Sequence, residues 1–203
     1  FSSANPFTLS LPSKSWDGRL YTSTDTINWN EVAAASTITA GSADGVYKLY
    51  FRGTGNTRIS SGYGSQWAIG ADPGTVACSG NIETLLDHAT VTAGAHPAMT
   101  TNCFSYLFYN CSALSSAPAL PATTLAKGCY KSMFEGCTEL TRAPALPATT
   151  LAEGCYTWMF SICTGLTNAP ALPATTLAES CYEGMFDECT RLTNAPALPA
   201  TTL

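Results

Sequence analysis

The chain is poor in charged residues, and the few it has are dispersed. Lys, Arg, Asp and Glu make up 11 % of its 203 residues, with a formal net charge of −5, whereas roughly 25 % is usual for a soluble protein. The nine Lys and Arg residues stand singly, but binding to a phosphate backbone or an anionic membrane surface needs clustered cations. The composition therefore argues against nucleic acid and anionic lipid as partners.

Long apolar runs and a recognisable leader are missing as well. No stretch approaches the roughly 18 consecutive apolar residues that a membrane-spanning helix needs, so we expect no membrane insertion. The sequence opens with FSSANPF, without Met and without a charged leader segment. Any signal peptide is therefore expected to be absent, already removed or outside this stretch.

Only two histidines are present, and no catalytic arrangement forms around them. His88 and His96 lie in the middle of the chain, where we expect polar surface roles. Gly53-Thr54-Gly55 lacks the third glycine of a dinucleotide-binding fingerprint and does not open a helix. A zinc site would need close-spaced Cys or His ligands. We therefore predict a non-enzymatic protein without a metal or cofactor.

What the chain has in abundance is internal repetition. Near-identical blocks, 26 residues apart, begin at Cys103, Cys129, Cys155 and Cys181, and the fourth stops at Leu203, three residues short of its period. A fixed period of this length predicts one structural unit stacked on copies of itself. Such a solenoid is a surface for binding and rarely a pocket for chemistry. The incomplete last repeat suggests a fragment.

The spacing of apolar residues predicts a short helix in each repeat. Cys129, Met133, Cys137 and Leu140 follow at i, i+4, i+8 and i+11, within an arc of roughly 80° on a helix. We expect the helix over residues 126–137, followed by a short extended piece. The predicted core of the second and third repeats consists of Cys129, Met133, Phe134, Cys137, Leu140, Cys155, Met159, Phe160, Cys163 and Leu166.

The order Met133-Phe134-x-x-Cys137-x-x-Leu140, followed by a Leu-Pro step, resembles the BspA-like leucine-rich repeats. These occur in surface proteins of host-associated bacteria and in some of their phages. The resemblance covers residues 103–203, although the usual unit of that family is a few residues shorter and its strand is richer in Ile. It implies an extracellular binding or adhesion role, without naming a ligand.

The N-terminal half has a different character. In residues 1–76, short runs of alternating apolar and polar residues are bounded by turn formers, which predicts a small antiparallel β-sandwich. Residues 77–102 are expected to form a junction that caps the first repeat. The predicted fold class is thus α+β: a β-sandwich, this cap, and over 103–203 a leucine-rich solenoid with short helices and short parallel strands. The expected core aromatics of the sandwich are Trp16, Trp29, Tyr50 and Trp67.

Eight of the nine cysteines form pairs eight residues apart, one pair per repeat, and Cys78 stands alone. Eight helical residues rise about 12 Å, too far for a disulfide within a pair. We therefore expect a column of buried thiols that pack as small hydrophobic groups, with disulfides or metal binding as the less favoured alternatives.

The four repeats differ most at positions predicted to face outward. Two interpretations stay open: these positions drift because nothing constrains them, or they form a presented surface. Trp158 and Ile162, one predicted helical turn apart, favour a surface, because exposed large apolar residues are costly unless they meet a partner. The predicted ligand-binding residues are Trp158, Ile162, Tyr106, Arg142 and Arg191.

These observations favour a secreted or surface-displayed, non-enzymatic binding or adhesion module that contacts a protein or glycan. One alternative is a phage structural protein on the virion, for receptor binding or for capsid or tail decoration. Another is the targeting module of a larger glycan-processing enzyme. A homo-oligomer, or docking on a larger assembly, is compatible with each of them.

Overall fold

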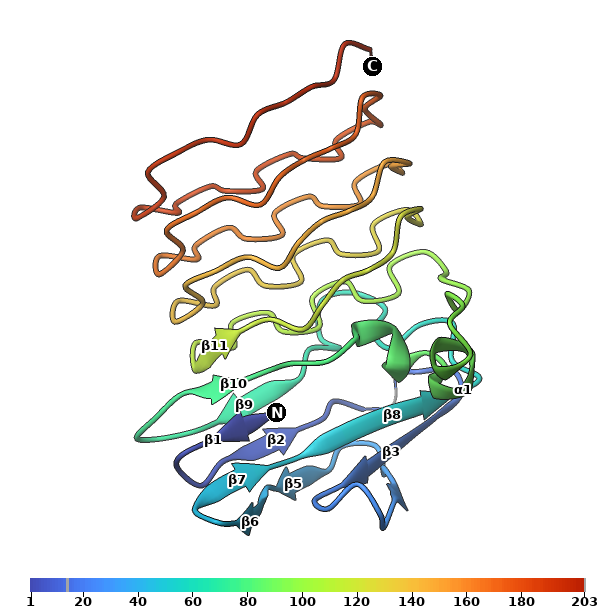
Figure 1. Ribbon diagram of the computed structural model, residues 1–203, viewed down its shortest axis with the longest axis vertical. Helices are drawn as coiled ribbons and strands as arrows, with labels where there is room; N and C mark the ends of the chain where they lie inside the picture. The colour runs from blue at the N-terminus through green and yellow to red at the C-terminus, as the bar shows by residue number, and fades with distance from the viewer. Residues whose placement is uncertain (14, 203) are drawn as a thin grey trace.

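The N-terminal half forms three small sheets, and the repeats are stacked beyond them (Figure 1). The computed structural model describes residues 1–13 and 15–202. The five-stranded sheet has the order β11-β10-β1-β7-β6, and its strands are Leu114–Ser116, Val76–Ala77, Ser2–Ser3, Val46–Lys48 and Gly41–Ala43. The sheet β5-β2-β9 consists of Thr37–Thr39, Thr8–Ser10 and Ala68–Gly70. The sheet β4-β3-β8 consists of Asn30–Glu31, Arg19–Ser23 and Tyr50–Thr54.

Local turn chemistry sets the ends of these strands. β6 and β7 pair antiparallel around Asp44 and Gly45, whose φ angles are 52° and 76°. Two consecutive left-handed residues make the hairpin turn that an Asp-Gly pair favours. In the neighbouring sheet, the fully buried Leu9 of β2 lies opposite Ile38 of β5 and Ile69 of β9.

Two short helical elements lie between the sheets and the repeats. The 3-10 helix η1 spans Ile82–Leu85 and the helix α1 spans His88–Thr92. Asn81 caps the first by accepting the Glu83 N–H at 2.8 Å, and Asp87 caps the second by accepting the Thr90 N–H at 2.8 Å. Beside them, β10 pairs in parallel with β11 of the first repeat, which joins the two halves of the chain.

Each repeat contains a turn segment in which backbone hydrogen bonds alternate between two directions. The turn segments are residues 100–111, 126–137, 152–163 and 178–189. In the second, every other N–H donates to the carbonyl three residues earlier; these donors are Cys129, Lys131, Met133, Glu135 and Cys137. The intervening N–H groups donate at 2.8–3.0 Å to carbonyls 25 residues later, in the next repeat; these donors are Gly128, Tyr130, Ser132, Phe134 and Gly136. Both sets of backbone groups are thereby satisfied.

This pattern depends on a left-handed residue at every fourth position. In the second turn segment, Gly128, Ser132 and Gly136 have φ angles of 59°, 51° and 74°. Each of them reverses the curl of the chain, so alternate N–H groups point toward the next repeat instead of bonding four residues back. A helix cannot form under these conditions.

Two columns of stacked rings run through the repeats. Phe104, Tyr130, Tyr156 and Tyr182 stack with centroids 5.8–5.9 Å apart. Phe108, Phe134, Phe160 and Phe186 stack at 5.7–5.9 Å. The second column ends on Trp67, which meets Phe108 edge to face at 6.3 Å and donates its backbone N–H to Leu107. The segment before β9 therefore covers the first repeat as another repeat would.

The predicted fold class is wrong in its main features. The sequence predicted helices in an α+β solenoid, but the described part of the repeats holds turns, the short strand β11 and isolated bridges, while both helical elements precede the repeats. Apolar residues spaced by four mimic a helical stripe, although the left-handed residues between them exclude one.

The N-terminal prediction needs correction too. Three small sheets replace the two-layer sandwich. Trp16 and Trp67 are buried, but Trp29 and Tyr50 are only half-buried, and both line a cavity. The domain boundaries at residues 76 and 102 stay a prediction. The buried residues from Phe7 to Cys189 form one continuous hydrophobic cluster, which extends across both boundaries.

Candidate functional site

Several of the positions that vary between repeats are left-handed. Two of these columns, which we name the outward columns, hold Tyr106, Ser132, Trp158 and Gly184, and Asn110, Gly136, Ile162 and Glu188. All eight residues have φ between 51° and 74°. The recurrence of Gly and Asn at intervals of four residues was the sequence signal of this backbone conformation, and the sequence analysis missed it.

Side chains in these columns lean toward the following repeat. A Cβ atom built on Gly136 would collide with Asn110 Oδ1, and one built on Gly184 would lie 2.7 Å from the ring of Trp158. A large residue is thus followed, one repeat later, by a glycine that leaves room for it. Trp158 is half-buried because its ring lies against Gly184, and part of the variation between repeats is steric matching.

Ile162 has no such explanation. Its φ is 59° and 38 % of its surface is exposed. The left-handed region costs an ordinary residue about 1–2 kcal/mol, and a β-branched residue there is a clear outlier. The same position holds Asn110, Gly136 and Glu188 in the other repeats, so the fold itself does not require an apolar residue there.

Three tyrosines form an exposed aromatic cluster at the first repeat. Tyr63 is 75 % exposed, and its ring centroid lies 5.9 Å from that of Tyr106 and 5.6 Å from that of Tyr109. Tyr106 and Tyr109 are 5.5 Å apart. Partial burial, followed by the charge of Glu135, raises the pKa of Tyr109. The sequence pointed to Tyr106 alone; Tyr63 and Tyr109 join it through the fold.

The two predicted arginines lie elsewhere in the repeat. Arg142 and Arg191 are exposed and follow the end of their turn segments. Arg142 occupies the place that Ser116 of β11 has in the first repeat. Among the described residues, neither makes an ion pair or a cation–π contact. The structure does not bring them to Trp158, whereas Ile162 and Trp158 share one turn segment.

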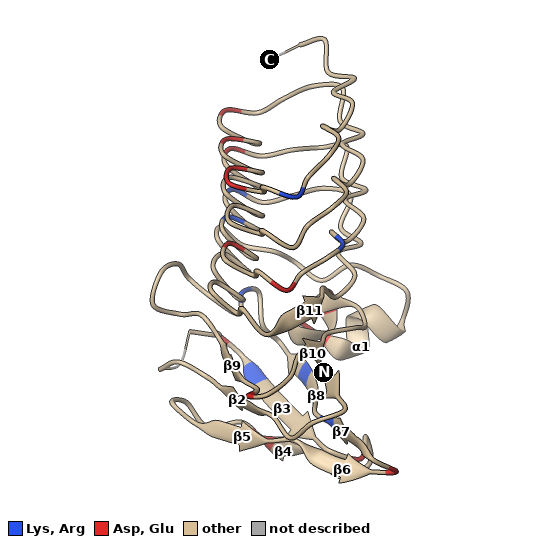
Figure 2. Ribbon diagram, turned by 90° about the vertical axis from the view of Figure 1, so that its left-hand side faces the viewer, with Lys and Arg blue, Asp and Glu red and all other residues tan. Residues whose placement is uncertain are grey.

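Most charged residues of the repeats lie along one vertical edge of the stack, where acidic residues predominate (Figure 2). Lys127 and Glu153 of neighbouring repeats pair at 2.7 Å, with both side chains at least half exposed. An exposed pair of this kind contributes little to stability. This edge is therefore a solvated face with negative character.

The residues predicted as core lie inside the stack. All ten have 0 % exposure, and all nine cysteines are free and buried. The second thiol of each pair donates to a carbonyl of the preceding layer: Cys137 to Phe108 at 3.1 Å and Cys163 to Phe134 at 3.0 Å. Burial raises the pKa of Cys155 to about 12. Such thiols are poor nucleophiles, so they are structural groups.

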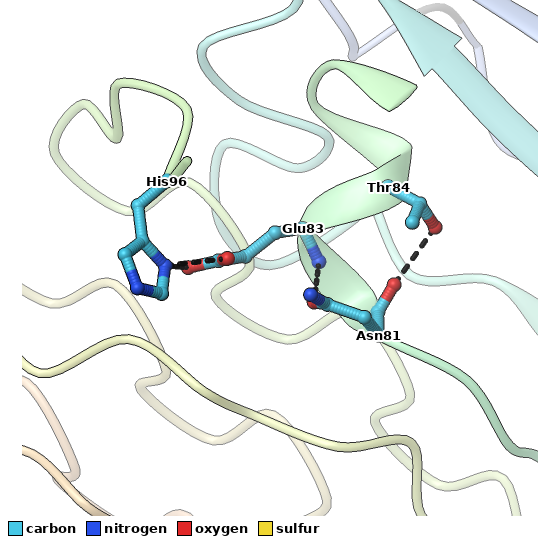
Figure 3. Close-up of polar contacts among 4 residues, drawn as sticks. All are labelled: Asn81, Glu83, Thr84 and His96. Carbon is cyan, nitrogen blue, oxygen red and sulfur yellow. Dashed lines mark hydrogen bonds and ion pairs between the residues drawn. The ribbon is translucent and has the colours of Figure 1, made fainter. Parts of the chain in front are cut away.

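One buried carboxylate is paired with a histidine (Figure 3). Glu83 is 1 % exposed, and its two oxygens accept from Nδ1 of His96 at 2.8 and 3.0 Å. The pair borders a cavity of about 350 Å³ whose lining includes Met99, Thr123 and Thr124. The contact satisfies the buried carboxyl group of Glu83. His96 was expected at the surface, and 55 % of its side chain is exposed, whereas Glu83 was not recognised as its partner.

No other arrangement in the described chain suggests chemistry. Residues 1–13 and 15–202 contain no group of three or more His, Cys, Asp or Glu side chains placed to hold a metal. Within the same residues, neither helical element is long and apolar enough to cross a membrane. What remains as a candidate site is a surface: the outward columns around Ile162 and Trp158, with the tyrosine cluster at the first repeat.

The resemblance to BspA-like repeats rests on the Met-Phe-x-x-Cys-x-x-Leu pattern alone and stays a prediction. Comparison with protein-family models, curated proteins and solved structures yields no match.

Proposed function

We propose that this protein is a non-enzymatic binding module that contacts a protein or glycan outside the cell through the outward columns of its repeats. Ile162 carries the proposal, because it is exposed, apolar and strained at a position where three other repeats place Asn, Gly or Glu. The turn pattern requires a left-handed backbone at this position but not a β-branched residue, and residues held in unfavourable backbone conformations concentrate at functional sites.

Neighbouring aromatic residues support the same face. Trp158 precedes Ile162 by one turn and belongs to the same column as Tyr106. Exposed Tyr and Trp rings offer rigid contact area at a low cost in conformational entropy. The rings of Tyr106 and Trp158 lie two repeats apart in this column, where both would contact a ligand extended along the stack.

A binding screen with matched variants tests this proposal. The chain is screened against glycans and purified cell-surface proteins, and each hit is titrated with the native chain, Ile162→Asn and Trp158→Ala. Truncating a central anchor costs about 2 kcal/mol or more, roughly 30-fold in affinity. Ile162→Asn copies Asn110, and release of about 1–2 kcal/mol of strain should offset part of its lost packing, so the chain stays folded.

Asp44→Asn is the control, because Asp44 has a similar φ of 52° but lies in the hairpin between β6 and β7, outside the outward columns. We expect it to keep the affinity of every hit, while both other variants lose affinity. Equal binding by Ile162→Asn and the native chain for every hit would refute the proposal.

A further inference from the structure

A cavity of about 720 Å³ is lined mainly by residues of the N-terminal half. β8 pairs with β3 along one edge and lies near η1 and α1. Residues 50–52 of β8 line one part of the cavity, and residues 78–82 line another. Its volume is in the range of roughly 300–1,000 Å³ that is typical of small-molecule sites.

The lining of this cavity is positive, although the protein as a whole is acidic. Lys48 and Arg52 line it, whereas none of the 14 Asp and Glu residues does. In the described part of the chain, neither Lys48 nor Arg52 forms an ion pair. Asp87, next to His88, is engaged by the N–H groups of Gly55 and Thr90. The cations thus face the cavity without an acidic partner.

Arg52 is held in place by stacking. Its guanidinium carbon lies 4.1 Å from the centre of the Trp29 ring, which is cation–π distance. The Trp29 indole N–H donates to the Thr26 carbonyl at 2.9 Å. This contact restrains the guanidinium before any ligand arrives, and such preorganisation strengthens binding.

A single carboxylate organises the loop that carries Trp29. Asp25 Oδ1 accepts the N–H groups of Asn28 and Ile27 at 2.8 and 2.9 Å, and its Oδ2 accepts the Asn28 side-chain amide at 2.7 Å. These donors, the Asn28 backbone N–H first, hold the pKa of Asp25 well below its ordinary value of 3.8. The loop is therefore closed by internal bonds and leaves Arg52 available.

We propose that this cavity binds an acidic saccharide, that is, a sugar bearing a carboxylate or sulfate group. The planar fork of Arg52 matches two oxygens of such a group, and Lys48 adds a second positive charge. Tyr50 also lines the cavity, and an aromatic ring is a suitable contact for the apolar face of a sugar. Ser79 and Asn81 also line the cavity and supply neutral hydrogen-bonding groups for sugar hydroxyls. This site is separate from the outward columns and does not depend on them.

Calorimetric titration tests the proposal with four probes: digalacturonate, a sulfated disaccharide, lactose and a triglutamate peptide. We expect at least one acidic disaccharide to bind, more weakly as salt rises, and lactose to bind at least tenfold more weakly. Arg52→Gln should lose roughly 10- to 100-fold in affinity, the usual effect of removing a hydrogen bond to a charged group. Lys48→Gln, at an exposed position, should also weaken binding.

Arg58→Gln is the matched control, because Arg58 is exposed and does not line the cavity; it should bind like the native chain. Trp158→Ala should also keep the acidic sugar, which separates this site from that of the proposed function. The proposal is overturned if neither acidic disaccharide binds, if lactose or triglutamate binds equally well, or if folded Arg52→Gln and Lys48→Gln both retain native affinity.

Discussion

Single residues inside the stack are selected by packing, and one of them carries an unsatisfied polar group. Tyr130 is 1 % exposed, and its hydroxyl has no hydrogen-bond partner among the described residues. The equivalent residue of the first repeat is Phe104, which stacks on Tyr130 at 5.8 Å. The column therefore accepts a phenyl ring in this place.

Tyr130→Phe should accordingly stabilise the protein. Burying a hydroxyl without a partner costs about 1–3 kcal/mol, so we expect a gain of about 1 kcal/mol in the free energy of unfolding, measured by urea denaturation. Tyr182→Phe is the control, since Tyr182 is half-buried and water can reach it. A loss of stability in Tyr130→Phe would mean that the hydroxyl has a partner after all.

The buried thiols make stability depend on alkaline pH. Burial raises the pKa of Cys78, Cys111 and Cys155 from the ordinary value of 9.0 to about 12. Between these values the unfolded chain loses thiol protons that the folded chain keeps. The stabilisation is thus complete below pH 9 and is lost as pH rises toward 12.

Urea denaturation at a series of pH values checks this dependence. The free energy of unfolding should stay level up to about pH 8.5 and fall above it, and Cys155→Ala should show a shallower fall. Tyr182, whose pKa burial raises from 10.0 to about 12, adds to the decline above pH 10. Stability that is level up to pH 11 would contradict the burial of these thiols.

At the scale of the element, the sequence predicted which positions of the repeat are buried but not the conformation between them. Cys129, Met133 and Cys137 are spaced by four, close to the 3.6 residues of a helical turn, so apolar spacing alone could not separate a helix from successive turns. Gly128 and Gly136, at the same interval, carried the missing information. Each backbone N–H group bonds either to the carbonyl three residues back or to a carbonyl of the next repeat. Which of the two it does depends on the stacked neighbour, so the sequence of a single repeat does not predict it.

The candidate site was predictable to a similar extent. Trp158 and Ile162 stood out because they are large and apolar in variable columns. The tyrosine cluster was not predictable, because Tyr63 lies far from Tyr106 in the sequence and meets it only when the N-terminal half covers the first repeat. Arg142 was assigned to the same face because its position varies between repeats, but this variation does not show which way the side chain points.

Steric matching between neighbouring turn segments gives a direct test at this scale. Gly184→Ala places a methyl group 2.7 Å from the Trp158 ring, at a φ of 60°. Overpacking costs about 1–3 kcal/mol and left-handed strain about 1–2 kcal/mol, so thermal and urea denaturation should show a loss of at least about 2 kcal/mol.

A double-mutant cycle isolates the contact. In the Trp158→Ala background, Gly184→Ala should cost only the backbone strain, about 1 kcal/mol. Equal costs in both backgrounds would show that Trp158 does not lie over Gly184, and its ring would then be free in solution.

Over the whole molecule, stability is divided among the contacts between adjacent layers. Trp67 covers the first repeat, and the two ring columns continue from repeat to repeat with nearly parallel planes. Backbone N–H groups of each turn segment except the last pair with the next repeat at intervals of 25 residues. A stack of this kind should still fold after the loss of one complete repeat, but not after a deletion that shifts the register of a turn segment against its neighbour.

Deleting one complete period tests this account most directly. Removal of residues 131–156 joins Tyr130 to Thr157 in the same register, so the shortened chain should fold cooperatively, with a smaller urea m-value because it buries less surface. Removal of residues 131–154 shifts the turn segment by two residues and should abolish cooperative unfolding. Cooperative unfolding by both variants, or by neither, would contradict the stacking of the repeats through their turn segments.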